Sequence, residues 1–86
     1  MRKNLIGERL KIARLIQKPS LSQKELIAKL QVYGVEVPDN AISRIESGTR
    51  PVTDIELVAF SKILNVPVLW LLGMDSSDNA NIIRFT

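Results

Sequence analysis

Apolar residues recur along this chain at the spacing of short amphipathic helices, and the pattern predicts five of them. The first is expected over residues 4 to about 17, because Pro19 disfavours helical geometry at the residue before it. Its buried stripe falls on Ile6, Leu10, Ala13 and either Ile16 or Gln17. Leu5, Ile12 and Leu15 widen the apolar face, so we expect some of them to meet a later element or a partner.

The second predicted helix opens on a complete start signal. Ser22 and Glu25 have the spacing of a capping box, in which the side chain of each accepts a hydrogen bond from the backbone N–H of the other. Leu21 and Leu26 are spaced as the accompanying hydrophobic staple. The helix is expected to reach about residue 33, with Gly34 as its left-handed stop.

A connector and a short third helix are predicted next. Residues 35–38 alternate apolar and polar and end on proline, which favours an extended segment. The third helix is expected to start between residues 38 and 40, with Asp39 or Asn40 as its cap, and to reach about residue 47. Its inward positions are predicted to be Ile42 and Ile45, and its outward positions Ser43, Arg44 and Ser47.

The same start signal recurs before the fourth helix. Thr53 and Glu56 have capping-box spacing, and Val52 and Leu57 form the staple. This helix is expected to end at residue 64, with Asn65 as its stop. A last short helix is predicted between Pro67 and Gly73, and its apolar residues are expected to lie in the core.

The pattern divides the chain into a domain at residues 1–73 and a tail at residues 74–86. The first part of the tail is polar and loop-like, whereas residues 81–86 are compatible with either a short strand or a frayed end. Because an isolated strand is unstable in water, a strand here would pair with a second copy or lie on the core. The tail is therefore a candidate dimerisation strand.

The composition is that of a small folded domain. The chain has 86 residues, of which 45% are hydrophobic, and this is enough for a single core. No apolar run approaches the roughly 20 residues that span a bilayer, and no signal-peptide core follows the first residues. Cysteine is absent, which excludes disulfides and thiolate metal sites. We expect a soluble, cytoplasmic protein without a cofactor.

Charge is distributed unevenly along the chain. Residues 1–18 contain six basic side chains and one acidic one, a balance of +5. Residues 19–50 are balanced, and residues 51–86, with two basic and four acidic side chains, carry −2. A basic front suits a protein that turns one side toward a polyanion, although an ordinary solvated helix face gives the same pattern.

Catalysis is not expected from this sequence. Histidine and cysteine are both absent, so nucleophilic triads and the common zinc sites are unavailable. Glu25 and Glu56 are assigned to capping boxes, and the four glycines are too scattered to form a phosphate-binding loop. We expect no enzyme and no metal site.

Four motifs occur in a characteristic order: Leu-Ser-Gln-Lys-Glu-Leu at residues 21–26, Ile-Ser-Arg-Ile-Glu-Ser-Gly at 42–48, Arg-Pro at 50–51 and Leu-Asn-Val-Pro-Val-Leu-Trp-Leu-Leu at 64–72. Together they resemble the helix-turn-helix domain of Cro proteins and phage repressors, also called the xenobiotic-response-element type of regulator. The resemblance covers about residues 5–73. It implies an all-α, compact five-helix, lambda-repressor-like fold with the DNA docking geometry described for that family.

The resemblance also assigns residues to DNA contacts. Gln23 matches a glutamine that binds a backbone phosphate, and Arg50 matches a backbone-contacting position in the loop after the third helix. Asp39, Asn40, Ser43 and Arg44 match positions that reach base edges, although Asp39 and Asn40 have capping as an alternative, which we favour for Asp39. The full set of candidate DNA-binding residues is Gln23, Lys24, Asp39, Asn40, Ser43, Arg44 and Arg50.

Arg14 and Glu46 match an ion pair of the family that joins the first helix to the third. The chain also departs from the family pattern between the second and third helices. Gln31 stands where glycine is usual, the connector is about five residues longer, and Ile27 replaces a small alanine at the contact of the two helices. A wider spacing of the two helices is expected.

We expect a transcriptional regulator, specifically a repressor, that binds a near-palindromic operator as a homodimer and associates with the nucleoid. Its half-sites would lie about 34 Å apart. The alternative is a protein-interaction module on the same scaffold, such as an antitoxin-like or polymerase-binding protein, and a regulatory protein partner fits either. A DNA reader loses affinity linearly with salt on logarithmic axes, which separates the two.

Overall fold

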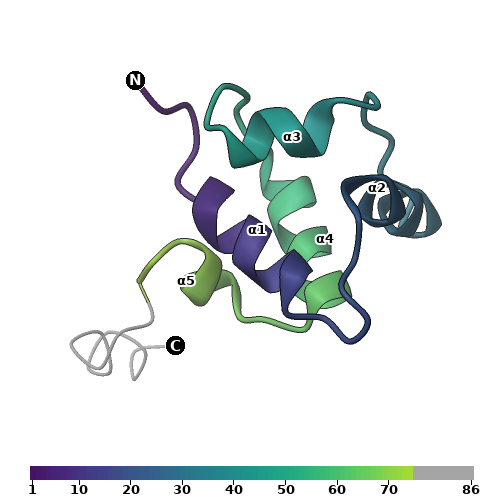
Figure 1. Ribbon diagram of the computed structural model, residues 1–86. Helices are drawn as coiled ribbons and strands as arrows, with labels where there is room; N and C mark the ends of the chain where they lie inside the picture. The colour runs from purple at the N-terminus through teal and green to yellow at the C-terminus, as the bar shows by residue number, and fades with distance from the viewer. Residues whose placement is uncertain (75–86) are drawn as a thin grey trace.

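The computed structural model describes residues 1–74 and is all-helical over that range (Figure 1). Its helices are α1 (Gly7–Leu15), α2 (Gln23–Val32), α3 (Ala41–Glu46), α4 (Asp54–Leu64) and α5 (Val68–Leu71). The expected all-α fold of five helices is thereby confirmed. The strand considered for residues 81–86 lies outside the described residues, and the division at residue 73 stays a prediction.

The first helix is shorter at both ends than the apolar pattern predicts. Asn4 lies before the helix, and its Oδ1 accepts hydrogen bonds from the backbone N–H groups of Ile6 and Gly7 at 3.0 and 2.8 Å. At the other end the chain turns away after Leu15, and the backbone N–H of Leu21 donates to the carbonyl of Arg14 at 3.1 Å. The range of residues 4–17 was wrong because side-chain and loop hydrogen bonds replace the helical ones there.

The start and stop signals of α2 and α4 are confirmed. Both capping boxes, Ser22 with Glu25 and Thr53 with Glu56, have their two reciprocal hydrogen bonds. Gly34 (φ +78°) and Asn65 (φ +55°) adopt the left-handed conformation that ends a helix. These signals fix where each helix begins and stops within about one residue, which in turn fixes which side chains point inward.

The side-chain cap predicted for α3 is absent, and the helix begins at Ala41. Asn40 is the N-cap residue by position, but its side chain makes no capping hydrogen bond. Asp39 lies outside the helix and makes no side-chain hydrogen bond to any residue of 1–74, so the capping role favoured for it was wrong. The first helical N–H is instead bound by a backbone carbonyl, because the N–H of Ala41 donates to the carbonyl of Pro38 at 2.9 Å.

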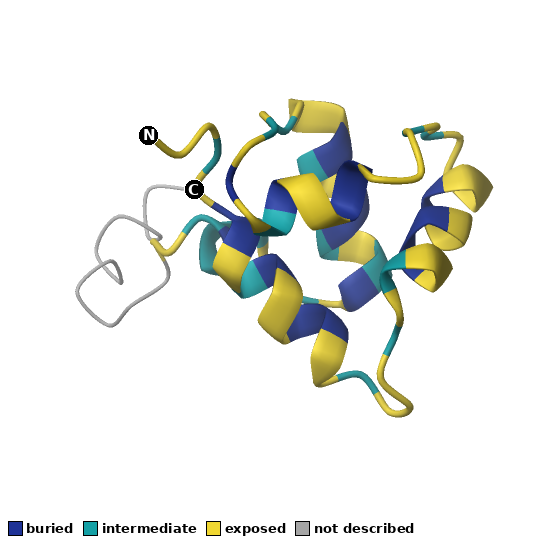
Figure 2. Ribbon diagram, turned by 45° about the horizontal axis from the view of Figure 1, so that its top comes forward, coloured by how far each residue is buried: buried dark blue, intermediate teal, exposed yellow. Residues whose placement is uncertain are grey.

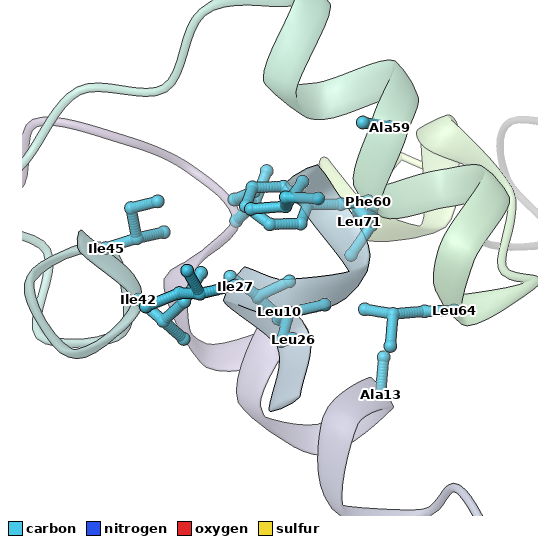
Figure 3. Close-up of a cluster of buried hydrophobic side chains, with 12 residues drawn as sticks. Leu10, Ala13, Leu26, Ile27, Ile42, Ile45, Ala59, Phe60, Leu64 and Leu71 are labelled. Carbon is cyan, nitrogen blue, oxygen red and sulfur yellow. The ribbon is translucent and has the colours of Figure 1, made fainter. Parts of the chain in front are cut away.

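The core draws on all five helices: Figure 2 marks the buried positions of the backbone in dark blue, and Figure 3 shows buried side chains pointing toward one another. Ile42 and Ile45 of α3 are fully buried, as predicted, as is Phe60 of α4. The predicted stripe of α1 is buried at Ile6, Leu10 and Ala13. Burial of this apolar surface is the main stabilising term available to a chain without disulfides.

The outer apolar residues of α1 and of the residues flanking it remain uncovered by residues 1–74. Leu5, Ile12 and Leu15 are 76%, 49% and 46% exposed. Ile16, one of the two alternatives for the last position of the predicted stripe, is also exposed. Gln17 takes the inner position, where its Nε2 donates to the carbonyls of Ala13 and Leu64 at 3.0 and 3.1 Å. These bonds tie the end of α1 to the end of α4.

The N-terminal end of α1 lies directly against the C-terminal end of α3. A Cβ atom on Gly7 would stand 2.4 Å from the carbonyl oxygen of Ile45, closer than side chains tolerate. Asn4 bridges the same region, because its Nδ2 donates to the carbonyls of Ile45 and Arg50 at 3.0 and 2.8 Å. Glycine and asparagine at these positions therefore set the distance between α1 and α3.

Candidate nucleic-acid interface

One face of α3 is polar and points into solvent. Residues 40, 43, 44 and 47 follow the spacing that places side chains on one side of a helix, and all four are exposed. The exposure predicted for Ser43, Arg44 and Ser47 is confirmed. The opposite side of α3, with Ile42 and Ile45, is buried, so the helix is held by one face and displays the other.

The two longest polar side chains of this face are available for an outside partner. Neither Arg44 nor Asn40 makes a side-chain hydrogen bond or ion pair with another residue of 1–74. The shorter side chains are used locally: Ser43 Oγ donates to the carbonyl of Asn40, and Ser47 Oγ to that of Arg44, both at 3.1 Å. An unpaired guanidinium and an unpaired amide four residues apart are the donors and acceptors that base edges require.

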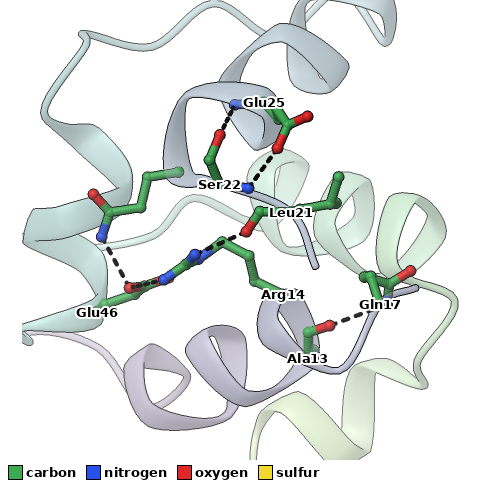
Figure 4. Close-up of polar contacts among 8 residues, drawn as sticks. Ala13, Arg14, Gln17, Leu21, Ser22, Glu25 and Glu46 are labelled. Atoms are coloured by element: carbon green, nitrogen blue, oxygen red, sulfur yellow. Dashed lines mark hydrogen bonds and ion pairs between the residues drawn. The ribbon is translucent and has the colours of Figure 1, made fainter. Parts of the chain in front are cut away.

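Glu46, at the end of α3, joins three segments of the chain (Figure 4). Its carboxylate accepts from Arg14 of α1 through Nε at 2.8 Å and Nη2 at 3.0 Å, a bidentate pair. The side chains of Arg14 and Glu46 are only 8% and 6% exposed. The pair that the resemblance implied is therefore present, and its burial makes its geometry well defined.

Gln23 is attached to the same carboxylate. Its Nε2 donates to Glu46 Oε1 at 3.0 Å, which the sequence did not indicate. Arg14 also donates from Nη1 to the carbonyl of Leu21 at 2.8 Å, just before α2 begins. The start of α2 and the end of α3 are thus linked through one buried ion pair, which fixes the angle between these two helices.

The N-terminal end of α2 is exposed beside α3. Helix geometry leaves the backbone N–H groups of Gln23 and Lys24 without partners inside the helix, and the Lys24 side chain is exposed. Glu25 completes the cap. The backbone N–H of Ser22, and then its hydroxyl, hold the pKa of Glu25 below its usual range. The end of α2 is therefore well ordered and retains free N–H groups at its positive pole.

Arg50 is bound within the protein. Its guanidinium forms a bidentate pair with Glu56 of α4, with Nη1–Oε1 at 3.0 Å and Nη2–Oε2 at 3.1 Å. Burial raises the pKa of Glu56, but the hydrogen bonds from Arg50 and from the Thr53 backbone outweigh this, and the net pKa is lowered. From its spacing, Glu56 was expected only to complete a capping box, and the six-residue separation of opposite charges is the one sequence signal for this pair.

The long connector between α2 and α3 packs onto the core. Val35 and Val37 contact the core, whereas Glu36 and Pro38 are exposed, so the predicted alternation holds. Ile27 is 7% exposed and lies in the same core cluster as Ile42. The bulkier contact and the longer connector are accommodated together, and α3 still presents its polar face beside the start of α2.

A family model described as helix-turn-helix matches residues 10–71 of this chain, which includes most of α1 and all of α2 to α5. The chain belongs to the Cro/C1-type helix-turn-helix family. Membership makes it a DNA-binding transcription regulator in kind. Comparison with curated proteins and with solved structures gave no match.

Two further features of this helix-turn-helix protein concern other classes of site. In residues 1–74, no cluster of three or more carboxylates is placed to hold a metal ion. None of the helices in that range combines the length and the hydropathy that crossing a membrane requires. The polar face of α3 and the start of α2 remain the candidate interface.

Proposed function

We propose that this regulator represses transcription by binding, as a homodimer, an operator with two-fold symmetry. In this proposal α3 enters the major groove of each half-site, and the N-terminal end of α2 rests on the DNA backbone. Half-sites separated by one helical turn, about 34 Å, would match the two copies of α3.

The observation that carries the proposal is the unpaired Arg44 and Asn40 on a helix whose other face is buried. Arginine pairs with guanine and asparagine with adenine through two hydrogen bonds each, and each such pair contributes about 1–3 kcal/mol of discrimination. Fixed orientation matters because both bonds of a pair must form together. The buried Arg14–Glu46 pair supplies that orientation.

Other candidates take supporting roles. Gln23, Lys24 and the free N–H groups of α2 would bind a phosphate at the helix N-terminus, where the dipole favours an anion. Ser43 lies on the exposed face of α3, and Asp39, which caps no helix, would accept from a cytosine amino group. Arg50 would touch the DNA backbone only with the N–H groups that Glu56 leaves free.

Selection from a pool of random duplexes tests the proposal. We expect the selected sequences to share a motif with two-fold symmetry and half-sites about one turn apart. Affinity for that motif should fall linearly with salt concentration on logarithmic axes, with a slope set by the phosphates neutralised. Failure to enrich any motif, together with no salt-dependent binding to duplex DNA, would contradict it and favour a protein-interaction module.

A further inference from the structure

An apolar hollow lies where the N-terminal segment meets the start of α4 and the end of α5. Its volume is about 320 Å³. Apolar side chains form most of it, and one basic and one acidic residue border it: Lys3, Leu5, Val52, Asp54, Leu57 and Leu72. Leu5 is 76% exposed, so this apolar surface faces solvent.

A projecting apolar pair lies beside the hollow. Asp54, which borders the hollow, is followed on the outer side of α4 by Ile55 and Val58. Ile55 and Val58 are 68% and 45% exposed. A hollow and an adjacent projection on one surface are what a self-complementary, two-fold interface requires.

The charges at this surface are also self-complementary. Lys3 and Asp54 are exposed, and neither forms an ion pair with a residue of 1–74. A two-fold axis repeats every contact, so Lys3 of each copy would meet Asp54 of the other. By contrast, the exposed residues Ile12 and Ile16 lie in a stretch, residues 9–20, that has no acidic side chain, so a two-fold contact there would pair no opposite charges.

We propose that the hollow, together with Ile55 and Val58, is the interface between two copies of this chain. We call this surface the α4 face. The inference rests on the homodimer of the proposed function and assigns its location. Each Ile55 enters the hollow of the other copy, and the two Lys3–Asp54 pairs close the contact.

The α4 face lies next to the DNA-reading helix. The backbone N–H of Lys3 donates to the carbonyl of Gly48 at 2.8 Å, two residues beyond the end of α3. The backbone linkage between α3 and the α4 face is therefore short. A dimer formed through this face would hold the two α3 helices at a set separation.

Charge exchange on the full chain tests the interface. In Lys3→Glu, both inter-copy pairs become acid against acid, and in Asp54→Lys both become base against base. We expect each variant alone to self-associate about tenfold more weakly than the original chain. An equimolar mixture should recover the original affinity, because each mixed dimer contains two opposite-charge pairs. Sedimentation equilibrium without DNA measures all three.

Lys18→Glu and Glu36→Lys serve as matched controls, since they make the same charge changes at exposed positions that lie in the loops before and after α2. We expect neither control to alter self-association, alone or mixed. A mixture of the two interface variants that associates no better than either alone overturns the proposal. So does an original chain that stays monomeric, in which case another segment or protein covers the hollow.

DNA binding by the same proteins separates this inference from the proposed function. A symmetric motif bound by a dimer that the charge exchange leaves unaffected would place the interface elsewhere and leave the function intact. If the original chain binds no DNA sequence specifically, the proposed function itself is wrong.

Discussion

Glu46 is the residue through which the candidate interface is held together. It accepts two hydrogen bonds from Arg14 and one from Gln23, in a site where little solvent reaches either charged group. A buried ion pair contributes little to the free energy of unfolding when the protein is compared with one in which apolar residues replace both partners. Removal of one partner is costly, because it leaves the other charge without compensation.

We therefore expect Glu46→Gln to lower the free energy of unfolding by roughly 3–5 kcal/mol, as measured by urea titration. Glu8→Gln is the matched control. Glu8 pairs with Arg2 at 3.1 Å, but the two side chains are 77% and 50% exposed, so its loss should cost less than about 1 kcal/mol. Equal effects of the two substitutions would mean that the Arg14–Glu46 pair is solvated rather than buried.

Glu56 makes stability depend on pH. Its pKa is lower in the folded protein than in the unfolded chain, so its contribution is complete above the unfolded value of about 4.3 and is lost as pH falls through the folded pKa. We expect Glu56→Gln to be less stable than the original chain at pH 7. The difference should shrink steadily below about pH 5.

Unfolding in urea at a series of pH values measures this difference directly. Other carboxylates, including Glu25 with its lowered pKa, are present in both proteins and cancel in the comparison. A gap in stability that is the same at pH 7 and pH 3 would show that Glu56 acts by packing and not by charge.

Some contacts between single residues could be predicted from the sequence and others could not. The Arg14–Glu46 pair was implied by the family resemblance, because four motifs in the family's order identify the helices that carry the two residues. The bonds from Asn4 to the carbonyls of Ile45 and Arg50 were not, since they join residues 41 and 46 positions apart without any local pattern. Asp39 failed as a cap because a backbone carbonyl already serves the first turn of α3.

At the scale of elements, α1 and α3 are placed by a close approach at Gly7. Glycine inside a helix normally destabilises it by up to about 1 kcal/mol relative to alanine, so Gly7→Ala would ordinarily stabilise the protein. Here the added Cβ would meet backbone oxygens of α3 at 2.4 and 3.0 Å, which cannot move aside as a side chain can.

We expect Gly7→Ala to reduce the unfolding free energy by about 1–3 kcal/mol, as overpacking does. It should also weaken specific DNA binding, because α3 must shift. Lys11→Ala, on the exposed side of the same helix, should change stability by less than about 0.5 kcal/mol. A stabilised Gly7→Ala protein would show that the contact between α1 and α3 is looser than described.

Helix boundaries were predictable where capping residues are near each other in the chain. Ser22 with Glu25 and Thr53 with Glu56 each act over three residues, and the local sequence therefore contains the whole signal. The ends of α1 were not predictable in this way, because its first turn depends on Asn4 and its last turn on a loop that returns at Leu21. Apolar spacing marks a helical face but does not say where its hydrogen bonds stop.

At the scale of the whole molecule, the buried face of α3 contributes to stability, and its exposed face carries the candidate DNA contacts. The core and the ion pair with Arg14 use the inner side, and Asn40 and Arg44 remain on the outer side. The sequence predicted this division from the positions of Ile42 and Ile45. It did not indicate how far the long connector would alter the arrangement, which depends on Val35 and Val37 packing onto the core.

If Arg44 reads a base, its removal must weaken binding to one duplex sequence more than to another. Arg44→Ala should lose about 1–3 kcal/mol of binding free energy on the selected operator and far less on a duplex of scrambled sequence. Lys24→Ala, at a proposed phosphate contact, should weaken both about equally and lower the salt slope by about 1. Equal losses by Arg44→Ala on the two duplexes would contradict the claim and reduce Arg44 to a phosphate contact.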